Sequence, residues 1–198
     1  MTLCRPAAAV KIHSLAQHRG GNVEDLQASP SFEQLTALPS ATVMVLRAEL
    51  EPLGNDVMRW HPAPGEWCVN EVLGHLLEAE RRGFAGRIQG IIAQPGRRLE
   101  TWDQGGVARQ RRDCQKDGLK LLREFEAARE ESVRLIRGLT PEQLRLSGTH
   151  PQVGELRVVD LLHEWVHHDR NHVKQILGNV QAYVWPHMGN AQLFSALD

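Results

Sequence analysis

The chain contains few cysteines and no long hydrophobic run. Its three cysteines, Cys4, Cys68 and Cys114, are odd in number and far apart, which argues against a disulfide framework and favours a reducing compartment. No stretch approaches the ~18 apolar residues that span a membrane. The first thirty residues also lack the continuous apolar segment of a signal peptide. We therefore expect a cytoplasmic protein with no membrane partner.

Net charge is also nearly absent. The 23 lysines and arginines almost balance 24 acidic residues and leave a net charge of -1, so no strong field attracts the chain to nucleic acid. Two local arginine clusters lie beside acidic residues, which is typical of solvated helix faces. They are Arg81, Arg82 and Arg87, and Arg109, Arg111 and Arg112. We expect no nucleic-acid partner.

Apolar residues recur with helical spacing in four segments, and no segment alternates with the period of a strand. The segments span about residues 40–51, 69–93, 115–137 and 157–177. Pro39 predicts a break before the first segment, so that residues 31–38 form at most a short separate helix. Gly178 predicts the end of the last segment. About 20 residues separate the second and third segments, which suits a crossover connection better than a simple hairpin.

This pattern predicts an all-α protein, a four-helix bundle with a long crossover connection between helices two and three. The length suits one domain. We expect residues 1–29 to form a weakly structured N-terminal extension and residues 30–180 to form the bundle. Residues 181–198 form a C-terminal tail that packs on the bundle or at a dimer interface. The apolar residues of that tail are Tyr183, Val184, Trp185, Met188, Leu193 and Phe194.

The last helical segment holds two pairs of histidines at i,i+4 spacing, which places two imidazoles one above the other. At about 100° per residue, His172 lies within the apolar stripe and His168 at its edge, while His163 and His167 point the opposite way. A buried imidazole needs partners for both ring nitrogens. A metal ion would satisfy His168 and His172 together. A pair of hydrogen-bonded core histidines is the alternative, and the spacing does not decide between them.

Three other features bear on this site. His75 is the one histidine of the first three helical segments and lies beside the stripe of its helix, so it could supply a third ligand. Asp169 lies near the centre of an apolar face, where a bare carboxylate is costly. Three explanations for this carboxylate are open. It forms a hydrogen bond or ion pair with a buried partner, it supports the metal ligands, or it occupies a shallow, partly hydrated position. Residues 163–167 match the zincin pattern H-E-x-x-H with Glu164 as the base, but their histidines point away from the stripe.

The two histidine regions resemble the DinB/YfiT-like superfamily. Residues 61–80 contain Pro-Gly-Glu-Trp before the His75 helix, and residues 168–176 read H-D-R-N-H-V-K-Q-I, similar to the family's closing helix. Residues 139–144 are similar to its link between helices three and four. The resemblance covers about residues 31–180. It implies a four-helix bundle and a divalent metal site whose ligands carry over as His75, His168 and His172. The ion could be Zn, Ni, Mn or Fe.

The sequence departs from the family pattern at Cys68, which stands where a helix-capping serine is usual. A serine there, with Glu71 three residues on, would form a capping box. A thiol at a helix N-terminus can have a lowered pKa and become reactive. A tolerated substitution is the interpretation we favour, because reactivity also requires exposure and a positive neighbourhood.

The resemblance also implies hypotheses about activity. Some members are transferases that use bacillithiol, mycothiol or glutathione, and members often form dimers. The leading hypothesis is therefore a homodimeric, metal-dependent S-transferase that joins a low-molecular-weight thiol to a small electrophilic substrate. Asp169 and His163 are candidates for a catalytic role or for support of the metal ligands. A metal-dependent hydrolase is the runner-up, and a non-enzymatic, metal-stabilised binding bundle is the third hypothesis.

Overall fold

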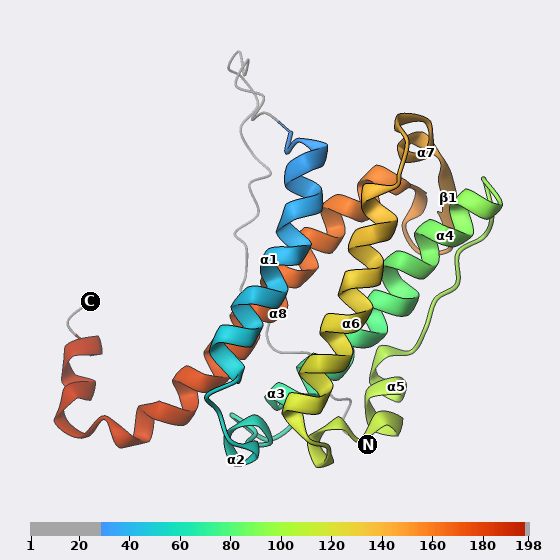
Figure 1. Ribbon diagram of the computed structural model, residues 1–198. Helices are drawn as coiled ribbons and strands as arrows, with labels where there is room; N and C mark the ends of the chain where they lie inside the picture. Colours follow the sequence, from blue (N-terminus) through green and yellow to red (C-terminus); the bar gives the residue numbers. More distant parts are fainter. Residues whose placement is uncertain (1–28, 197–198) are drawn as a thin grey trace, which may run out of the picture.

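Four long helical rods form the body of the protein. The computed structural model describes residues 29–196, so most of the expected N-terminal extension, with Cys4, lies outside the described residues. The rods are α1 (Phe32–Leu50), α3 (Val69–Glu78) continued through η1 (Ala79–Phe84) into α4 (Ala85–Ala93), α6 (Gly118–Arg137) and α8 (Val158–Val184). They lie side by side in Figure 1, and α1 and α3 both pack against α6 and α8. The predicted all-α four-helix bundle is confirmed.

The connection between the second and third rods is long, as expected, and carries short helices of its own. They are α5 (Gln104–Arg111) and η2 (Asp113–Gln115). A small hairpin of β1 (Ser147–His150) and β2 (Gly154–Arg157) precedes α8. The start of the connection pairs with this hairpin, because Leu99 N–H donates to Thr149 O over 2.9 Å and Thr149 N–H donates to Arg97 O over 2.8 Å. The crossover is thereby tied to the bundle.

The helix break predicted at Pro39 is wrong. Helix α1 runs from Phe32 to Leu50 with Pro39 inside it. A proline in a helix interior costs ~3 kcal/mol because it removes one hydrogen bond and crowds the preceding turn. Burial outweighs that cost, since one face of α1 is buried along its whole length. This face consists of Leu35, Thr36, Pro39, Thr42, Leu46 and Leu50.

The helix end predicted at Gly178 is also wrong, because α8 continues to Val184. A glycine within a helix costs only ~1 kcal/mol relative to alanine. The next residue, Asn179, is buried, and its side-chain amide donates to Trp67 O over 2.8 Å. This contact holds the continuation of α8 against the segment before α3.

The second rod contains one π-helical segment, η1. Val72, Leu76, Glu80, Phe84 and Ile88 are all buried and recur every four residues. An α-helix has 3.6 residues per turn, so a four-residue repeat drifts by about 40° at each step. The wider π turn absorbs part of this drift and keeps the later residues facing the core. It also places the charged side chain of Glu80 in the interior.

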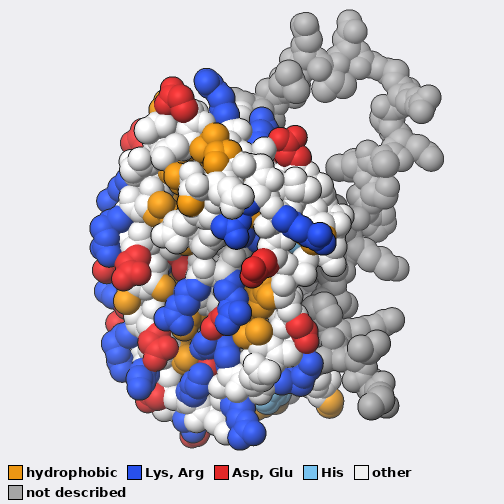
Figure 2. Space-filling model, turned by 90° about the vertical axis from the view of Figure 1, so that its right-hand side faces the viewer, with side chains coloured by type: hydrophobic (Ala, Val, Ile, Leu, Met, Phe, Trp, Pro, Cys, Tyr) orange, Lys and Arg blue, Asp and Glu red, His pale blue; other side chains and the backbone are white. Residues whose placement is uncertain are grey.

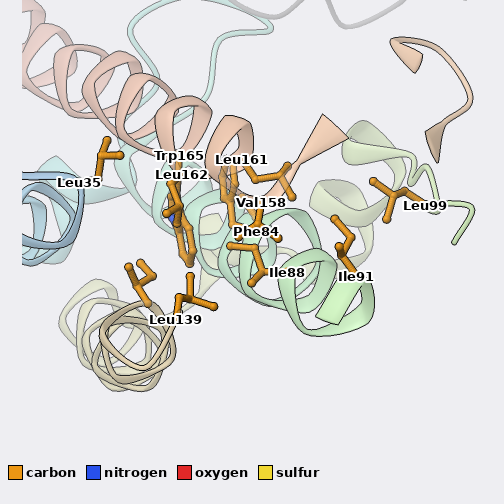
Figure 3. Packing of buried hydrophobic residues seen from close by; sticks show 12 residues of the cluster. Leu35, Phe84, Ile88, Ile91, Leu99, Leu139, Val158, Leu161, Leu162 and Trp165 are labelled. Carbon is orange, nitrogen blue, oxygen red and sulfur yellow. The ribbon is translucent and has the colours of Figure 1, made fainter. Parts of the chain in front are cut away.

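The core consists of two apolar clusters. One surrounds Trp165 of α8, whose ring stacks on Phe84 with centroids 4.8 Å apart (Figure 3). The other lies between the remaining parts of α1, α3, α6 and α8, with Phe125 fully buried. Burial of each large apolar side chain contributes ~1.5–3 kcal/mol. The metal-ligand candidates on α3 and α8 therefore stand on well-packed helices.

Short helices surround the bundle and complete the described chain. They are α2 (Asn55–Met58), α7 (Pro141–Arg145), η3 (Trp185–His187) and η4 (Gly189–Ala196). The last two follow α8 away from the bundle in Figure 1. The face in Figure 2 carries acidic and basic side chains interspersed. No helix among residues 29–196 is both long and apolar enough to cross a membrane.

Candidate metal centre

The structure brings His75, His168 and His172 together. One ring nitrogen of each lies within 4.8 Å of one ring nitrogen of the others. His75 comes from α3, whereas His168 and His172 come from successive turns of α8. The Nε2 atoms of His75 and His168 are 3.0 Å apart. The i,i+4 pair and the third histidine thus meet where α3 packs on α8.

Aromatic side chains surround the three imidazoles. Trp67 lies 5.2 Å from the His75 ring centroid, and Trp102 of the crossover stacks on the same ring at 6.0 Å. Phe84 meets the His168 ring edge-on at 5.2 Å. His75 is buried, while His168 and His172 keep some exposure. His75 on α3 is therefore the most enclosed of the three histidines, and His168 and His172 on α8 are half-buried.

A hydrogen bond determines which ring nitrogen of His172 carries the proton. Its Nδ1 lies 2.9 Å from the side-chain oxygen of Gln175. A carbonyl oxygen only accepts hydrogen bonds, so Nδ1 carries the proton and Nε2 presents a lone pair. Histidines that bind metals usually donate their other ring N–H in this way.

The electrostatics keep the three imidazoles neutral. Burial, reinforced by His172 and His168, lowers the pKa of His75 to about 2. Burial, with His172, Arg129 and His167, lowers the pKa of His168 to about 3. Burial also lowers the pKa of His172, although Gln175 opposes the shift. A metal ligand must be a neutral imidazole, which has one ring nitrogen without a proton, and these three rings are neutral at pH 7.

The cluster fits a divalent ion. At most one proton can lie between the facing Nε2 atoms of His75 and His168, and Nδ1 of His168 is buried with no hydrogen-bond partner among the described residues. Metal–nitrogen bonds of ~2.0–2.1 Å place two ligand nitrogens about 3 Å apart. The observed 3.0 Å agrees with that spacing. Imidazole nitrogen suits Zn, Ni, Cu and Fe.

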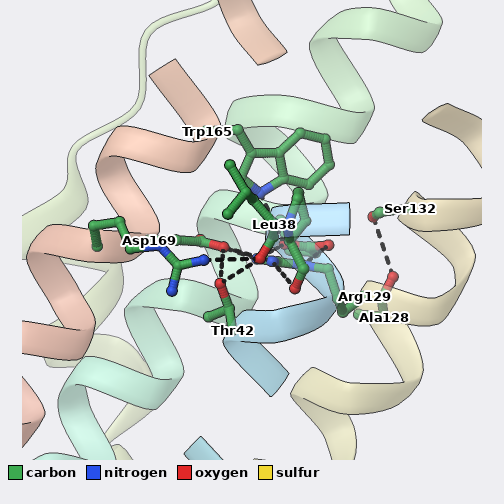
Figure 4. Close-up of polar contacts among 10 residues, drawn as sticks. Leu38, Thr42, Ala128, Arg129, Ser132, Trp165 and Asp169 are labelled. Carbon is green, nitrogen blue, oxygen red and sulfur yellow. Dashed lines mark hydrogen bonds and ion pairs between the residues drawn. The ribbon is translucent and has the colours of Figure 1, made fainter. Parts of the chain in front are cut away.

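Asp169 has a buried partner rather than a contact with the ligands. Its carboxylate receives two hydrogen bonds from the Arg129 guanidinium and one from the Thr42 hydroxyl at 2.8 Å (Figure 4). Arg129 also donates two bonds of 2.8 Å to Glu80, which accepts a third from the Trp165 indole. Asp169, the neighbour of His168, therefore ties α8 to Thr42 of α1 and to Arg129 of α6.

Charges within this buried cluster affect one another. Burial disfavours a charged Arg129, but Asp169 and Glu80 outweigh it and raise the pKa of the guanidinium. Burial raises the pKa of Glu80 although Arg129 opposes the shift. One guanidinium faces two carboxylates here. The positive charge of Arg129 thus compensates both buried carboxylates of the cluster.

The zincin-like residues occupy a different place. His163, Glu164 and His167 line a cavity of about 860 Å³, and they form no metal-ligand group among the described residues. His163 Nδ1 donates to Val159 O over 2.8 Å, and its Nε2 lies 3.4 Å from the Ser29 hydroxyl. The structure therefore does not bring His163 to the three-histidine cluster.

The same cavity adjoins the histidine cluster through one shared wall. Trp102 lines the cavity and also stacks on His75, whereas the three clustered histidines do not line it.

Arg87 of α4 lines the cavity too. Its Nε is buried with no hydrogen-bond partner among the described residues, while Nη2 donates to Glu100 O. Burial lowers the pKa of Arg87. An under-bonded guanidinium in a cavity suits an anionic ligand group.

Sequence reasoning missed several residues of this region. Glu80 lies at a stripe position of the second helix, and Arg129 lies between Phe125 and Ser132 on the buried face of α6. Opposite charges on two apolar stripes were the signal that could have paired them. Gln175, three residues after His172, was also detectable as a partner. Trp102 was not, because only the folded crossover brings it to His75.

The protein is thus a helical bundle in which three imidazoles cluster where α3 packs on α8. The family model described as the DinB superfamily matches residues 40–176. The chain therefore belongs to the DinB superfamily.

One solved structure with a similar fold is YfiT from Bacillus subtilis, described as a probable metal-dependent hydrolase with an unusual four-helix bundle topology. The match has a TM-score of 0.72 and 16% sequence identity and covers 86% of this chain and 96% of that chain. At this identity it is evidence for the fold alone. No curated protein matches the chain.

Proposed function

We propose that this protein is a metal-dependent S-transferase that joins a low-molecular-weight thiol to a small electrophile. Its ion, which is zinc, nickel, manganese or iron, binds to His75, His168 and His172. The observation that carries the proposal is the set of three neutral imidazoles, partly exposed on one side. Three protein ligands with an open position are typical of catalytic rather than structural metal sites.

Each part of the site has a role in this proposal. An ion held by three imidazoles keeps an open coordination position, and it lowers the pKa of a thiol or water molecule that binds there. The cavity of about 860 Å³ lies near the upper end of the ~300–1,000 Å³ range of small-molecule sites, so it has room for a thiol and an acceptor together. Trp102 lines this cavity and stacks on His75, so the cavity begins one side chain away from the histidine cluster. Arg87 binds a carboxylate of the thiol or of the acceptor.

The surroundings favour a thiol over water as the nucleophile. No aspartate or glutamate among residues 29–196 joins the histidine cluster within ligand distance. The nearby carboxylates of Asp169 and Glu80 are both bound to Arg129. A thiol, with an ordinary pKa of about 8.5, needs far less activation than water, with a pKa of ~15.7. A thiol can therefore react without a neighbouring base.

Hydrolysis is the second candidate. It is favoured by the similarity to YfiT, which is described as a probable metal-dependent hydrolase. Glu164 lines the cavity and could serve as the base that hydrolysis needs. In a third candidate, the ion only stabilises a binding bundle.

One assay separates these candidates. Wild-type protein loaded with each metal is mixed with glutathione, bacillithiol or mycothiol and with chlorodinitrobenzoate, whose carboxylate suits Arg87. The thiol loses its proton to solvent, and its sulfur displaces chloride, so that one carbon–sulfur bond forms as one carbon–chlorine bond breaks. The proposal expects metal-dependent conjugation that His172→Ala abolishes. The control His187→Ala should leave the conjugation rate unchanged, because His187 is exposed and lies in the C-terminal tail. Metal-dependent release of nitrophenol from nitrophenyl esters without any thiol-dependent reaction would favour the hydrolase.

We also propose that the protein is a cytoplasmic homodimer. Val184, Trp185, Leu193 and Phe194 of the tail have large exposed apolar side chains, which supports an interface between two copies. Light scattering after size exclusion should give twice the chain mass for wild type. It should give the monomer mass for Trp185→Ser/Phe194→Ser. A monomeric wild type would contradict this proposal.

A further inference from the structure

A second group of metal-ligand side chains lies outside the three-histidine cluster. It consists of His61, Cys68, Glu71 and Cys114, and one donor atom of each lies within 4.8 Å of those of the others. His61 precedes α3, Cys68 is the N-cap of α3, and Glu71 lies in its first turn. Cys114 comes from η2 in the crossover. Residues far apart in the sequence thus meet at the start of α3.

His61 is oriented toward the sulfur of Cys114. Its Nδ1 lies 2.8 Å from Glu66 O, so Nδ1 carries the proton and donates to that carbonyl. The other nitrogen, Nε2, therefore presents a lone pair, and it lies 3.2 Å from Cys114 Sγ. A backbone carbonyl bound to one ring nitrogen is the usual support of a metal-ligating histidine.

The two thiols are reduced and close together. Neither Cys68 nor Cys114 is in a disulfide. Burial, together with a contact to Cys114, raises the pKa of the Cys68 thiol. Without a metal this thiol is neutral and fully buried, which argues against the alternative of a reactive Cys68. Cys114 Sγ also lies 3.3 Å from Arg59 O.

We propose that His61, Cys68, Glu71 and Cys114 form a structural zinc site. Two sulfurs, one imidazole nitrogen and one carboxylate oxygen are all donor types that zinc binds, and four protein donors are the number that closes a structural site. Two S–H bonds break as two Zn–S bonds form, and both protons leave to solvent. His61 and Glu71 add a nitrogen and an oxygen donor without any change in oxidation state. His61 is exposed, so the ion has a path of entry.

The position of the zinc site indicates what it stabilises. It links the crossover to the first turn of α3, the helix that carries His75. Asp113, the neighbour of Cys114, is buried and forms ion pairs with Arg111 and Lys116. A Cβ atom at Gly74 would lie 1.8 Å from the Asp113 carboxylate, so the Asp113 side chain already packs directly against the backbone of α3 there. A zinc ion bound to Cys68 and Cys114 would add a second connection between the crossover and α3.

Cobalt(II) is the probe that distinguishes this site from the three-histidine cluster. A cobalt–thiolate bond produces a near-ultraviolet charge-transfer band, and a site of imidazoles alone does not. We expect this band in reduced wild type and in His172→Ala. We expect its loss in Cys114→Ser and its loss in Cys68→Ser, which restores the family's usual serine and should fold.

Zinc content and stability complete the test. The zinc-loaded wild type should hold about one more zinc ion per chain than Cys68→Ser, and added zinc should raise the Tm of wild type more than that of the variant. Circular dichroism checks that both proteins fold. A band that is absent from wild type, or that survives in both cysteine variants, would overturn the proposal. Equal zinc content in wild type and Cys68→Ser would do the same.

Discussion

Replacing Arg129 by methionine tests whether the buried ion cluster holds α8 in place. Arg129 is 1% exposed and makes five hydrogen bonds: two to Glu80, two to Asp169 and one to Pro39 O. Methionine fills much of the same volume but leaves two buried carboxylates facing each other. The donors that remain include the Thr42 hydroxyl for Asp169 and the Trp165 indole and Ser132 hydroxyl for Glu80.

The expected loss of unfolding free energy is large. Removing one partner of a buried ion pair costs ~3–5 kcal/mol, because the remaining charge is left uncompensated. Domains of this kind have a total stability of ~5–15 kcal/mol. Arg129→Met should therefore be folded but markedly weakened. Arg129→Lys keeps the charge and loses the bidentate bonds, so its stability should fall between that of Arg129→Met and wild type.

Urea unfolding of metal-free protein measures this loss, since chelation removes any contribution from bound ions. Arg123→Met is the matched control, because Arg123 lies exposed on the same helix and should change stability by no more than about 0.5 kcal/mol. A loss for Arg129→Met no larger than that of the Arg123 control would refute the assigned role of the cluster.

Three further substitutions test the site and its support. Gln175→Met removes the acceptor for His172 Nδ1 and should weaken metal affinity ~10–100-fold in a chelator competition, with the fold unchanged. Gly74→Ala places a Cβ against the Asp113 carboxylate, which its ion pairs keep in place. It should lower the free energy of unfolding by ~1–3 kcal/mol, as measured by urea unfolding. Arg87→Met should raise KM for chlorodinitrobenzoate by ~10–100-fold, because a charge-assisted hydrogen bond is lost. It should leave KM for the uncharged chlorodinitrobenzene unchanged.

Each of these substitutions has an outcome that contradicts its basis. Undiminished metal affinity in Gln175→Met would mean that the tautomer of His172 does not depend on this contact. Wild-type stability in Gly74→Ala would mean that the crossover moves away from α3 at little cost. Equal KM changes for the charged and uncharged electrophiles would remove Arg87 as the anion-binding residue.

Local patterns predicted the bundle well because each long helix buries one continuous face. The pair His168 and His172 was accessible for the same reason, since helical geometry alone decides which face they share. Pro39 and Gly178 misled the prediction because their local costs of ~3 and ~1 kcal/mol are smaller than the gain from burying the rest of the helix. The π-helical turn was not predicted, although the four-residue repeat through Glu80 was its signal.

Non-local contacts were out of reach. Arg129 contacts Glu80 and Asp169 on two other helices. Opposite charges on apolar stripes indicate that such residues need buried partners, but a single sequence does not reveal that one arginine serves both carboxylates. Cys68 and Cys114 are brought together only by the folded crossover. Trp102 reaches His75 by the same route. The sequence therefore predicted the ligand types and helix faces, whereas tertiary packing determines their neighbours.

Metal content tests the three-histidine centre most directly. Wild type and His172→Ala are purified without a nickel column, reloaded with zinc and analysed by mass spectrometry of metal and protein. The three-histidine site predicts that His172→Ala holds about one ion per chain fewer than wild type, whether or not the cysteine site is filled. Equal metal content in the two proteins, or no metal in reloaded wild type, would contradict it.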